Sequence, residues 1–171
     1  MPLVVVMGVS GCGKSSFGAA LAEKLGLPFI EGDALHSKAN IAKMSAGVPL
    51  NDEDRWPWLD KIGSELHQAA TTGGAVAACS AMKRAYRDRL RKAADDPVRF
   101  VHLHGNHAEL KARVSSRPDH FMPPSLLDSQ LATLEIPGAD EDVIRIDIET
   151  PVEHALAETL AAICAARAGS P

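Results

Sequence analysis

The chain has 171 residues, 46% of them hydrophobic and 23% charged, which are the proportions of an ordinary soluble domain. Its net charge of −4 gives no electrostatic reason to expect nucleic acid or an anionic membrane as a partner, and no apolar run approaches the ~20 residues of a membrane span. Three widely spaced cysteines and the lack of a basic, apolar leader argue against a disulfide framework, a zinc site or secretion. We therefore expect a single domain over residues 1–171, located in the cytoplasm.

The first predicted elements enclose the most informative stretch, residues 8–15, which read Gly-Val-Ser-Gly-Cys-Gly-Lys-Ser. An apolar run at 3–7 predicts a buried strand before it, and the apolar spacing at 16–25 predicts a helix after it. The stretch matches G-x-x-x-x-G-K-S, the phosphate-binding P-loop, in the strand–loop–helix context that this motif requires. The alternative is an ordinary glycine-rich turn, which needs neither the full pattern nor this context.

The chemistry of a P-loop depends on its backbone and on two side chains. The glycines let several N–H groups point at a di- or triphosphate, and the following helix adds the positive end of its dipole. Lys14 is expected to reach the β- and γ-phosphates, and the Ser15 hydroxyl to ligate Mg²⁺. The motif predicts as nucleotide-binding residues Gly8, Val9, Ser10, Gly11, Cys12, Gly13, Lys14, Ser15 and Ser16. Cys12 is interpreted as a small filler, with a redox-sensitive thiol as the alternative.

The rest of the chain alternates between strand and helix patterns. Further strands are predicted at 27–30, 75–80, 97–103 and 142–148. Helices are predicted at 37–47, 52–70, 83–91, 107–116, 125–135 and 150–168. This order, β-α repeated about five times, predicts an α/β fold in three layers, with a five-stranded parallel sheet and helices on both faces.

Polar residues follow two of the predicted strands, where an open parallel sheet gathers its ligands. Asp33 is a candidate to orient or deprotonate an acceptor hydroxyl, or to hold Mg²⁺ through water. Its alternative role is a helix N-cap. His36 is a candidate either for substrate binding or for packing alone, and Ser80 falls at the carboxyl end of the third strand.

Cationic side chains provide candidates for binding an anionic group. The planar fork of Arg55 suits a carboxylate or phosphate, although an ion pair with Asp52 or Asp54 is an equal alternative. Lys83 and Arg84 lie closest to the end of the third strand, in a helix whose other charges are typical of a solvated face.

Residues 117–124, Arg-Pro-Asp-His-Phe-Met-Pro-Pro, are irregular and broken by proline. In a phosphoryl-transfer enzyme such a segment suits a lid that excludes water and supplies an arginine, and its alternative is a surface loop. Arg117 is then a catalytic candidate, His120 a substrate-binding one, and Arg113 a candidate to contact adenine or phosphate. The absence of an N-K-x-D motif argues against a GTPase, and no apolar run ends in the Asp-Glu pair of motor ATPases, so a small-molecule kinase remains.

Further blocks carry a more specific pattern than the P-loop. They are Glu31-Gly32-Asp33 with His36 and Asn40, Lys43-Met44, Gly47 with Pro49-Leu50, Asp52, Asp54-Arg55, Pro57-Trp58-Leu59, Cys79-Ser80-Ala81 with Lys83, Tyr86-Arg87-Asp88 with Leu90-Arg91, His120-Phe121-Met122, Leu126-Leu127 with Ser129-Gln130, and Leu134-Glu135. With the P-loop, these blocks resemble the gluconokinases of the bacterial and animal thermoresistant type over nearly the whole chain. Asp119 departs from the glycine usual in that family, and Met82 from a usual leucine.

The resemblance implies transfer of the γ-phosphate of ATP to the 6-hydroxyl of D-gluconate, a three-layer P-loop kinase fold with a lid at about 117–124, and commonly a homodimer. Lys14, Asp33 and Arg117 are then the catalytic candidates. The candidates for binding gluconate are Asp33, His36, Arg55, Ser80, Lys83, Arg84 and His120. Two alternatives stay open: a kinase for another small acid such as shikimate, and a non-enzymatic sensor in which the nucleotide only orders the lid.

Overall fold

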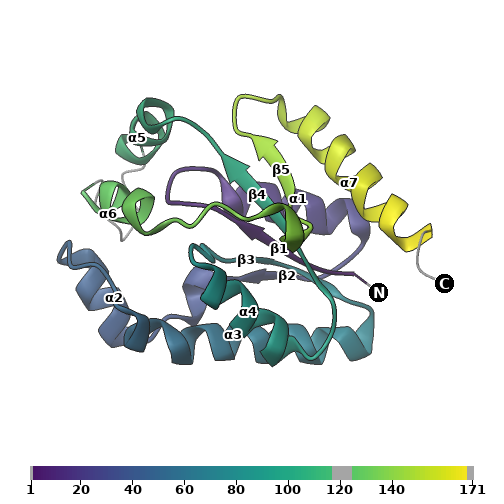
Figure 1. Ribbon diagram of the computed structural model, residues 1–171, viewed down its shortest axis with the longest axis horizontal. Coiled ribbons are helices and arrows are strands. Elements are labelled where there is room, and N and C mark those ends of the chain that lie inside the picture. Colours follow the sequence, from purple (N-terminus) through teal and green to yellow (C-terminus); the bar gives the residue numbers. More distant parts are fainter. Residues whose placement is uncertain (1, 117–124, 169–171) are drawn as a thin grey trace.

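The computed structural model of the chain describes residues 2–116 and 125–168. Their centre is a parallel sheet in the order β2-β3-β1-β4-β5 (Figure 1). The strands are β1 (Leu3–Met7), β2 (Phe29–Glu31), β3 (Ala75–Ala78), β4 (Val98–His104) and β5 (Ile144–Asp147). The predicted five-stranded parallel sheet is confirmed. The central strand β1 pairs with β3 and β4 and is buried at all 5 positions, which suits its run of β-branched residues.

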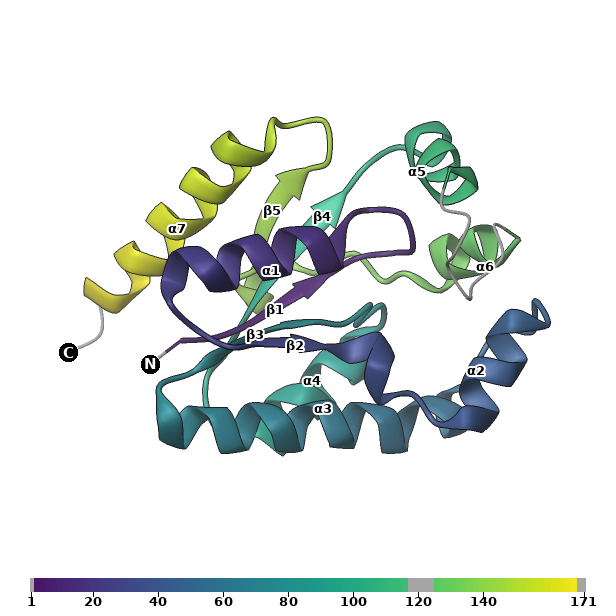
Figure 2. The ribbon, with the colours of Figure 1, turned by 180° about the vertical axis from the view of Figure 1, so that it is seen from behind.

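Helices cover both faces of the sheet, as the α/β pattern predicts. The α-helices are α1 (Lys14–Leu25), α2 (Lys38–Ser45), α3 (Asp52–Thr72), α4 (Arg84–Ala94), α5 (His107–Ser115), α6 (Leu126–Thr133) and α7 (Val152–Ala168), and short 3-10 turns lie at η1 (Gly32–Leu35) and η2 (Ala139–Glu141). Helices α1 and α7 lie on one face, and α3 and α4 on the other (Figure 2). Helices α2, α5 and α6 extend beyond the carboxyl ends of the strands, away from the N-terminus (Figure 1).

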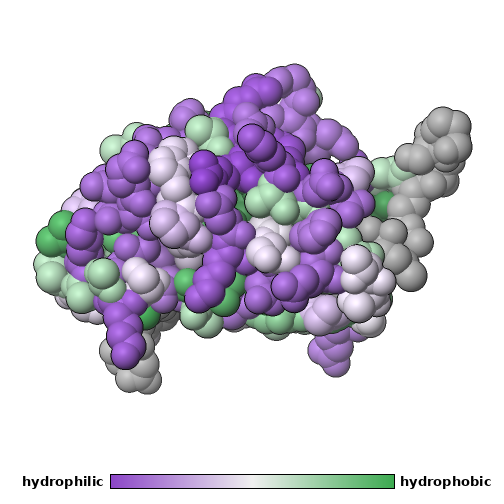
Figure 3. All heavy atoms as spheres, turned by 90° about the horizontal axis from the view of Figure 1, so that it is seen from below, coloured by the Kyte–Doolittle hydropathy of each residue, from purple (hydrophilic) through white to green (hydrophobic). Residues whose placement is uncertain are grey.

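Helix α3 shows how the sequence directs one face of a helix inward. Its buried residues recur every three or four positions and include Arg55, Leu59, Ile62 and Leu66. Its outer side contributes to a mainly hydrophilic face of the molecule (Figure 3). Arg55 is thus carried on the buried stripe, in the first turns of the helix.

Most of the predicted helix ends are observed, with some differences. Asn51 caps α3 in a reciprocal pair with Asp54, and Gly26 ends α1 in the left-handed conformation. Ser125 precedes α6 but makes no side-chain capping bond. The third strand ends at Ala78, two residues earlier than expected, because the chain turns there toward the P-loop and Gly8 donates its N–H to the carbonyl of Ser80.

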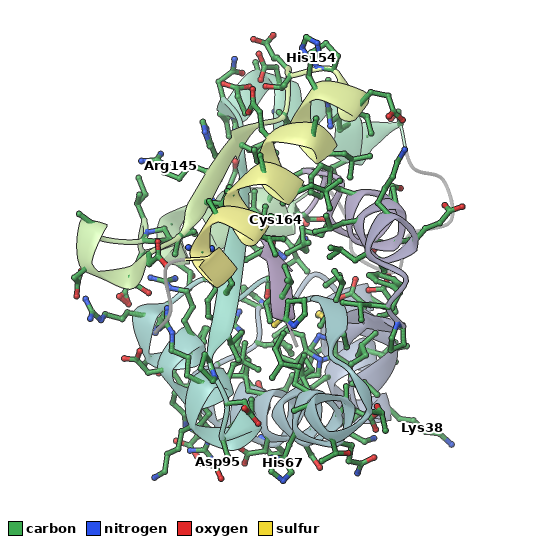
Figure 4. All side chains as sticks on the ribbon, turned by 90° about the vertical axis from the view of Figure 1, so that its right-hand side faces the viewer. Lys38, His67, Asp95, Arg145, His154 and Cys164 are labelled. Carbon is green, nitrogen blue, oxygen red and sulfur yellow. The ribbon has the colours of Figure 1, made fainter. Side chains whose placement is uncertain are left out.

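The cysteines are all free: Cys12 and Cys79 are buried, and Cys164 is exposed on α7 (Figure 4). Burial raises the pKa of Cys79 to about 12, so this thiol stays protonated. Within residues 2–116 and 125–168, no helix combines the length and apolar character needed to cross a bilayer.

A buried ion pair joins α4 to η2. Arg87 and Glu141 bond through two parallel contacts, Nε to Oε2 at 2.7 Å and Nη2 to Oε1 at 2.8 Å, and their side chains are 0% and 2% exposed. Arg87 also donates to the carbonyls of Ala81 and Met82, and Ala81 has a left-handed φ of 44°. The pair therefore holds in place the turn that follows β3.

We expect Glu141→Gln to reduce the free energy of unfolding by about 3–5 kcal/mol at pH 7, because it leaves the buried guanidinium uncompensated. The hydrogen bonds from Arg87 lower the pKa of Glu141 to about 2. The native state therefore favours the ionised carboxylate, and its contribution, about 3 kcal/mol above pH 5, is lost as the pH falls from about 4.5 toward 2. Urea unfolding at several pH values measures both effects.

Asp60→Asn, which removes an exposed ion pair with Arg89, is the control for Glu141→Gln and should reduce the free energy of unfolding by less than about 1 kcal/mol. Equal stability of Glu141→Gln and wild type would contradict this role.

Candidate active site

The P-loop runs from the end of β1 to the start of α1. Gly8, Gly11 and Gly13 have φ values of 145°, 84° and 90°, in the region that favours glycine. At Gly11 a Cβ atom would also lie 2.6 Å from Val114 Cγ2, so the loop packs against α5 too closely for any side chain. The Lys14 ammonium group donates to the carbonyl of Val9 at 3.1 Å, which folds this side chain over its own loop.

A cleft opens beside Lys14 at the carboxyl edge of the sheet. Its wall combines one cation of the P-loop, polar residues that follow β2 and β3, and side chains of α3 and α6. The lining residues are Lys14, Asp33, His36, Met44, Pro49, Leu50, Arg55, Trp58, Ser80, Met82, Leu126, Ser129 and Gln130. The structure thus brings together five of the predicted site residues from four separate segments: Lys14, Asp33, His36, Arg55 and Ser80.

Asp33 lies in the η1 turn, directly after β2. The N-cap of this turn is Glu31, whose side chain accepts from the Asp33 N–H at 3.4 Å, so the capping role that was the alternative for Asp33 belongs to another residue. The turn is fixed at Gly32, whose carbonyl accepts from Trp58 Nε1 at 2.8 Å. A Cβ atom at Gly32 would lie 2.1 Å from the carbonyl oxygen of Ala78, so only glycine lets the turn pack this closely on β3.

His36 forms the aromatic part of the cleft with Trp58. The two rings stack with centroids 4.0 Å apart and an interplanar angle of 14°. The Asn40 side-chain amide lies 3.3 Å from His36 Nδ1. Because the amide nitrogen donates, Nδ1 accepts and the ring proton sits on Nε2. Burial lowers the pKa of His36 to about 4, so near neutral pH the ring is an uncharged hydrogen-bond donor.

Arg55 is only 8% exposed, and its Nη1 donates to the Tyr86 hydroxyl at 2.8 Å. The alternative ion pairs are not formed within the described residues. Asp52 instead lies 3.1 Å from Lys83 Nζ, and Asp54 lies 2.8 Å from Lys43 Nζ. The Arg55 guanidinium is therefore not neutralised by Asp52 or Asp54, its neighbours on α3, and the residue lines the cleft.

The structure does not bring Lys83 and Arg84 into this cleft. Lys83 pairs with Asp52 and lines an adjoining hollow at the start of α3, which among the described residues shares only Leu50 and Arg55 with the cleft. Arg84 is exposed, and its Nη2 lies 2.6 Å from Asp140 Oδ2. Both side chains extend from the N-terminus of α4 toward carboxylates of other elements, α3 and η2. Their closeness in sequence to the end of β3 therefore does not place them in the cleft.

A second hollow lies on the other side of the P-loop. It is lined by Cys12, Gly13, Ser16, Phe17, Leu103, Arg113, Ile146, Asp147, Ile148, Thr150, Val152 and Ala155. Arg113 Nη2 donates to the carbonyl of Ile148 at 2.9 Å, which holds its planar group at this hollow. The position fits the predicted contact of Arg113 with adenine or phosphate. Arg117 and His120, with the predicted lid, lie outside the described residues.

Gln130 is a cleft residue that the motif analysis did not single out. It is buried on α6, and its Oε1 accepts from the backbone N–H of Ser10 at 2.6 Å, so α6 is bonded directly to the P-loop. The two residues are 120 positions apart. The only signal in the sequence was the Ser-Gln block at 129–130 among the family-like segments.

The donor set near the P-loop fits Mg²⁺ as a partly hydrated ion. Within the described residues, no group of three or more His, Cys, Asp or Glu side chains is arranged to hold a metal. The Ser15 hydroxyl and the Asp33 carboxylate are hard oxygen donors, and Mg²⁺ in phosphate sites is held by one or two such groups together with phosphates and water. These two residues are the candidates.

The chain is similar to known proteins in both sequence and structure. Residues 3–137 match the family model described as AAA domain. The chain is 52% identical over 159 residues to a gluconokinase of Gluconobacter oxydans, covering 92% of this chain and 88% of the relative. It is 44% identical over 167 residues to the thermosensitive gluconokinase of Escherichia coli, covering 95% and 88%. The crystal structure of a gluconokinase from Sinorhizobium meliloti superposes with a TM-score of 0.84 at 50% identity, covering 95% of this chain and 91% of that one.

Proposed function

The chain belongs to the gluconokinase family of P-loop kinases, and from this premise we propose that it transfers the γ-phosphoryl group of ATP to gluconate at the 6-hydroxyl, giving 6-phosphogluconate and ADP. The observation that carries the proposal is the position of Lys14, which belongs to the phosphate-binding loop and also lines the cleft with Asp33 and Arg55. One cation therefore adjoins both the donor phosphate and the acceptor.

The cleft offers complementary groups to a polyhydroxy acid. Arg55 is the cation for the carboxylate, because its remaining N–H donors suit two oxygens in one plane. His36 Nε2–H and Ser80 provide neutral hydrogen-bonding groups for the hydroxyls. Asp33 orients the reacting hydroxyl and accepts its proton.

On the nucleotide side, the backbone N–H groups of 8–15 and Lys14 hold the phosphates, and Arg113 contacts adenine from the second hollow. Phosphoryl transfer depends mainly on positioning and on neutralising charge at the transferring group. Mg²⁺ held at Ser15, and at Asp33 through water, would supply further positive charge at the β- and γ-phosphates. Arg117 and His120, in the lid predicted at 117–124, remain candidates for contacts with the phosphoryl group and the acceptor.

Two alternatives are less favoured. The relatives with 40–52% identity named as gluconokinases weigh against a shikimate kinase. A nucleotide sensor needs no acceptor cleft beside its P-loop. The homodimer, the cytoplasmic location and the single domain over 1–171 belong to the same proposal, and sedimentation of the purified protein tests the first of them.

An assay of ADP release over a panel of sugar acids tests the proposed activity. We expect gluconate to give the highest kcat/KM and the product to carry phosphate on its terminal hydroxyl. ATP binding with no ADP formed from any acceptor would favour the sensor. A higher kcat/KM with shikimate or another aldonate would replace gluconate as the acceptor.

We expect Arg55→Ala to raise the KM for gluconate about 10- to 100-fold, because hydrogen bonds to a charged group contribute about 1.5–3 kcal/mol. The KM for ATP should stay close to that of wild type. Steady-state kinetics with each substrate varied in turn separate the two effects. Arg89→Ala is the matched control, since Arg89 is a partly exposed arginine on α4 whose pair with Asp60 lies away from the cleft. An unchanged KM for gluconate would remove Arg55 from the acceptor site.

A further inference from the structure

A chain of hydrogen bonds leads from the cleft to the start of α3. Arg55 Nη1 donates to the Tyr86 hydroxyl at 2.8 Å, Tyr86 donates to Asp52 Oδ1, and Lys83 Nζ donates to the same oxygen at 3.1 Å. We infer that Tyr86, oriented by Asp52, is a positioning residue that presents Arg55 to the carboxylate of the acceptor. This inference rests on the proposed function, in which Arg55 binds that carboxylate.

The chemistry of the three groups fixes the direction of the chain. An ionised carboxylate only accepts hydrogen bonds, and a guanidinium only donates them. The single hydroxyl proton of Tyr86 therefore goes to Asp52, which leaves only lone pairs facing Arg55. The bonds from Tyr86 and Lys83 lower the pKa of Asp52, so the acceptor at the end of the chain stays ionised. Burial and the bond to Asp52 raise the pKa of Tyr86, so its proton is retained.

Packing restricts the same groups. Tyr86 is 0% exposed, and its ring meets that of Trp56 in a T-shaped contact at a centroid distance of 5.5 Å. The Arg55 guanidinium carbon lies 5.3 Å from the centroid of the tyrosine ring, and Lys83 Nζ lies 5.6 Å from it. One Arg55 nitrogen is thus engaged at a fixed point of α4, while the residue lines the cleft. Because the Arg55 guanidinium is fixed before the acceptor binds, binding does not carry the entropy cost of ordering this long side chain.

The role of Lys83 follows from this arrangement. The sequence suggested that Lys83 binds the acceptor directly, whereas its contact with Asp52 makes it part of the support for Tyr86.

Kinetics of Tyr86→Phe test the inference. We expect the KM for gluconate to rise several-fold, up to about tenfold, because the variant must order the Arg55 side chain when the acceptor binds, with kcat and the KM for ATP little changed. In an Arg55→Ala background the same substitution should have no further effect on the KM, because its effect is exerted through Arg55. Asp60→Asn, which removes another contact between α3 and α4, is the control for loosening of the helix pair. An equal rise of KM with and without Arg55 would overturn the positioning role and make Tyr86 a structural residue.

A second readout needs no substrate. Tyr86 is the single tyrosine of the chain, so its phenolate absorbance reports this hydroxyl alone. We expect Asp52→Asn to shift its titration to lower pH and Arg55→Ala to shift it to higher pH, because the carboxylate favours the protonated hydroxyl and the guanidinium disfavours it. A titration unmoved by Arg55→Ala would overturn the contact. Failure of the proposed function would appear differently, as a wild-type protein that releases no ADP with gluconate while the titration still decides whether Tyr86 holds Arg55.

Discussion

Replacing Lys14 with alanine is expected to lower kcat for gluconate phosphorylation by about three orders of magnitude or more. The ammonium group lies between the phosphate loop and the cleft, where negative charge develops on the transferring group. This reaction gains its rate mainly from positioning and charge stabilisation. Loss of the Lys14 charge therefore lowers the rate of the phosphoryl-transfer step itself. Single-turnover phosphorylation at saturating ATP and gluconate measures it.

Lys24→Ala is the matched control for Lys14→Ala. Lys24 lies at the other end of α1, with a side chain 51% exposed, and contacts Glu153 at 3.7 Å. Its loss should leave kcat unchanged. A Lys14→Ala variant with nearly wild-type turnover would mean that residues 8–15 do not hold the phosphates of a reacting nucleotide.

The second large effect is expected for Asp33→Asn. The amide keeps the shape of the side chain but cannot accept the proton of the acceptor hydroxyl, and a general base typically contributes about 10²- to 10⁴-fold in rate. We expect kcat to fall by that range while the Kd for ATP, measured by calorimetry, stays within about threefold of wild type, because the P-loop is intact.

Asp88→Asn provides the control for loss of an acidic side chain, because Asp88 is exposed on α4 and contacts only Arg84 and Arg91 among the described ion pairs. Unchanged turnover in Asp33→Asn would assign Asp33 to the structure of the η1 turn alone. A loss of ATP affinity equal to the loss of rate would mean that Asp33 binds the nucleotide or its metal ion directly rather than acting as the base.

The parts of the site that could be predicted from sequence are those fixed by local order along the chain. The P-loop is one continuous stretch, and its glycine positions report its backbone conformation directly. Asp33 and Ser80 follow strands of a parallel sheet, so topology alone brings them to the same edge. The five-stranded sheet followed from the alternating patterns for the same reason.

The parts that were not predicted depend on which side chains meet across the fold. Whether Arg55 pairs with Asp52 is decided by Lys83 and Tyr86, which lie at the start of α4, about 30 residues away. Arg84 meets Asp140 across 56 positions, so its place on the surface could not be read from its distance to β3. Local spacing along the sequence shows which candidate residues share one helix or strand. Their hydrogen-bond and ion-pair partners come from other helices and strands, which the spacing does not reveal.

A crystal structure with a non-hydrolysable ATP analogue, Mg²⁺ and gluconate tests the central claim most directly, that the cleft beside Lys14 is the acceptor site. We expect gluconate in this cleft, with its carboxylate on Arg55 and its terminal hydroxyl between Asp33 and the γ-phosphate. Gluconate bound elsewhere, or bound here with its carboxylate toward Asp33 and its terminal hydroxyl at Arg55, would contradict it.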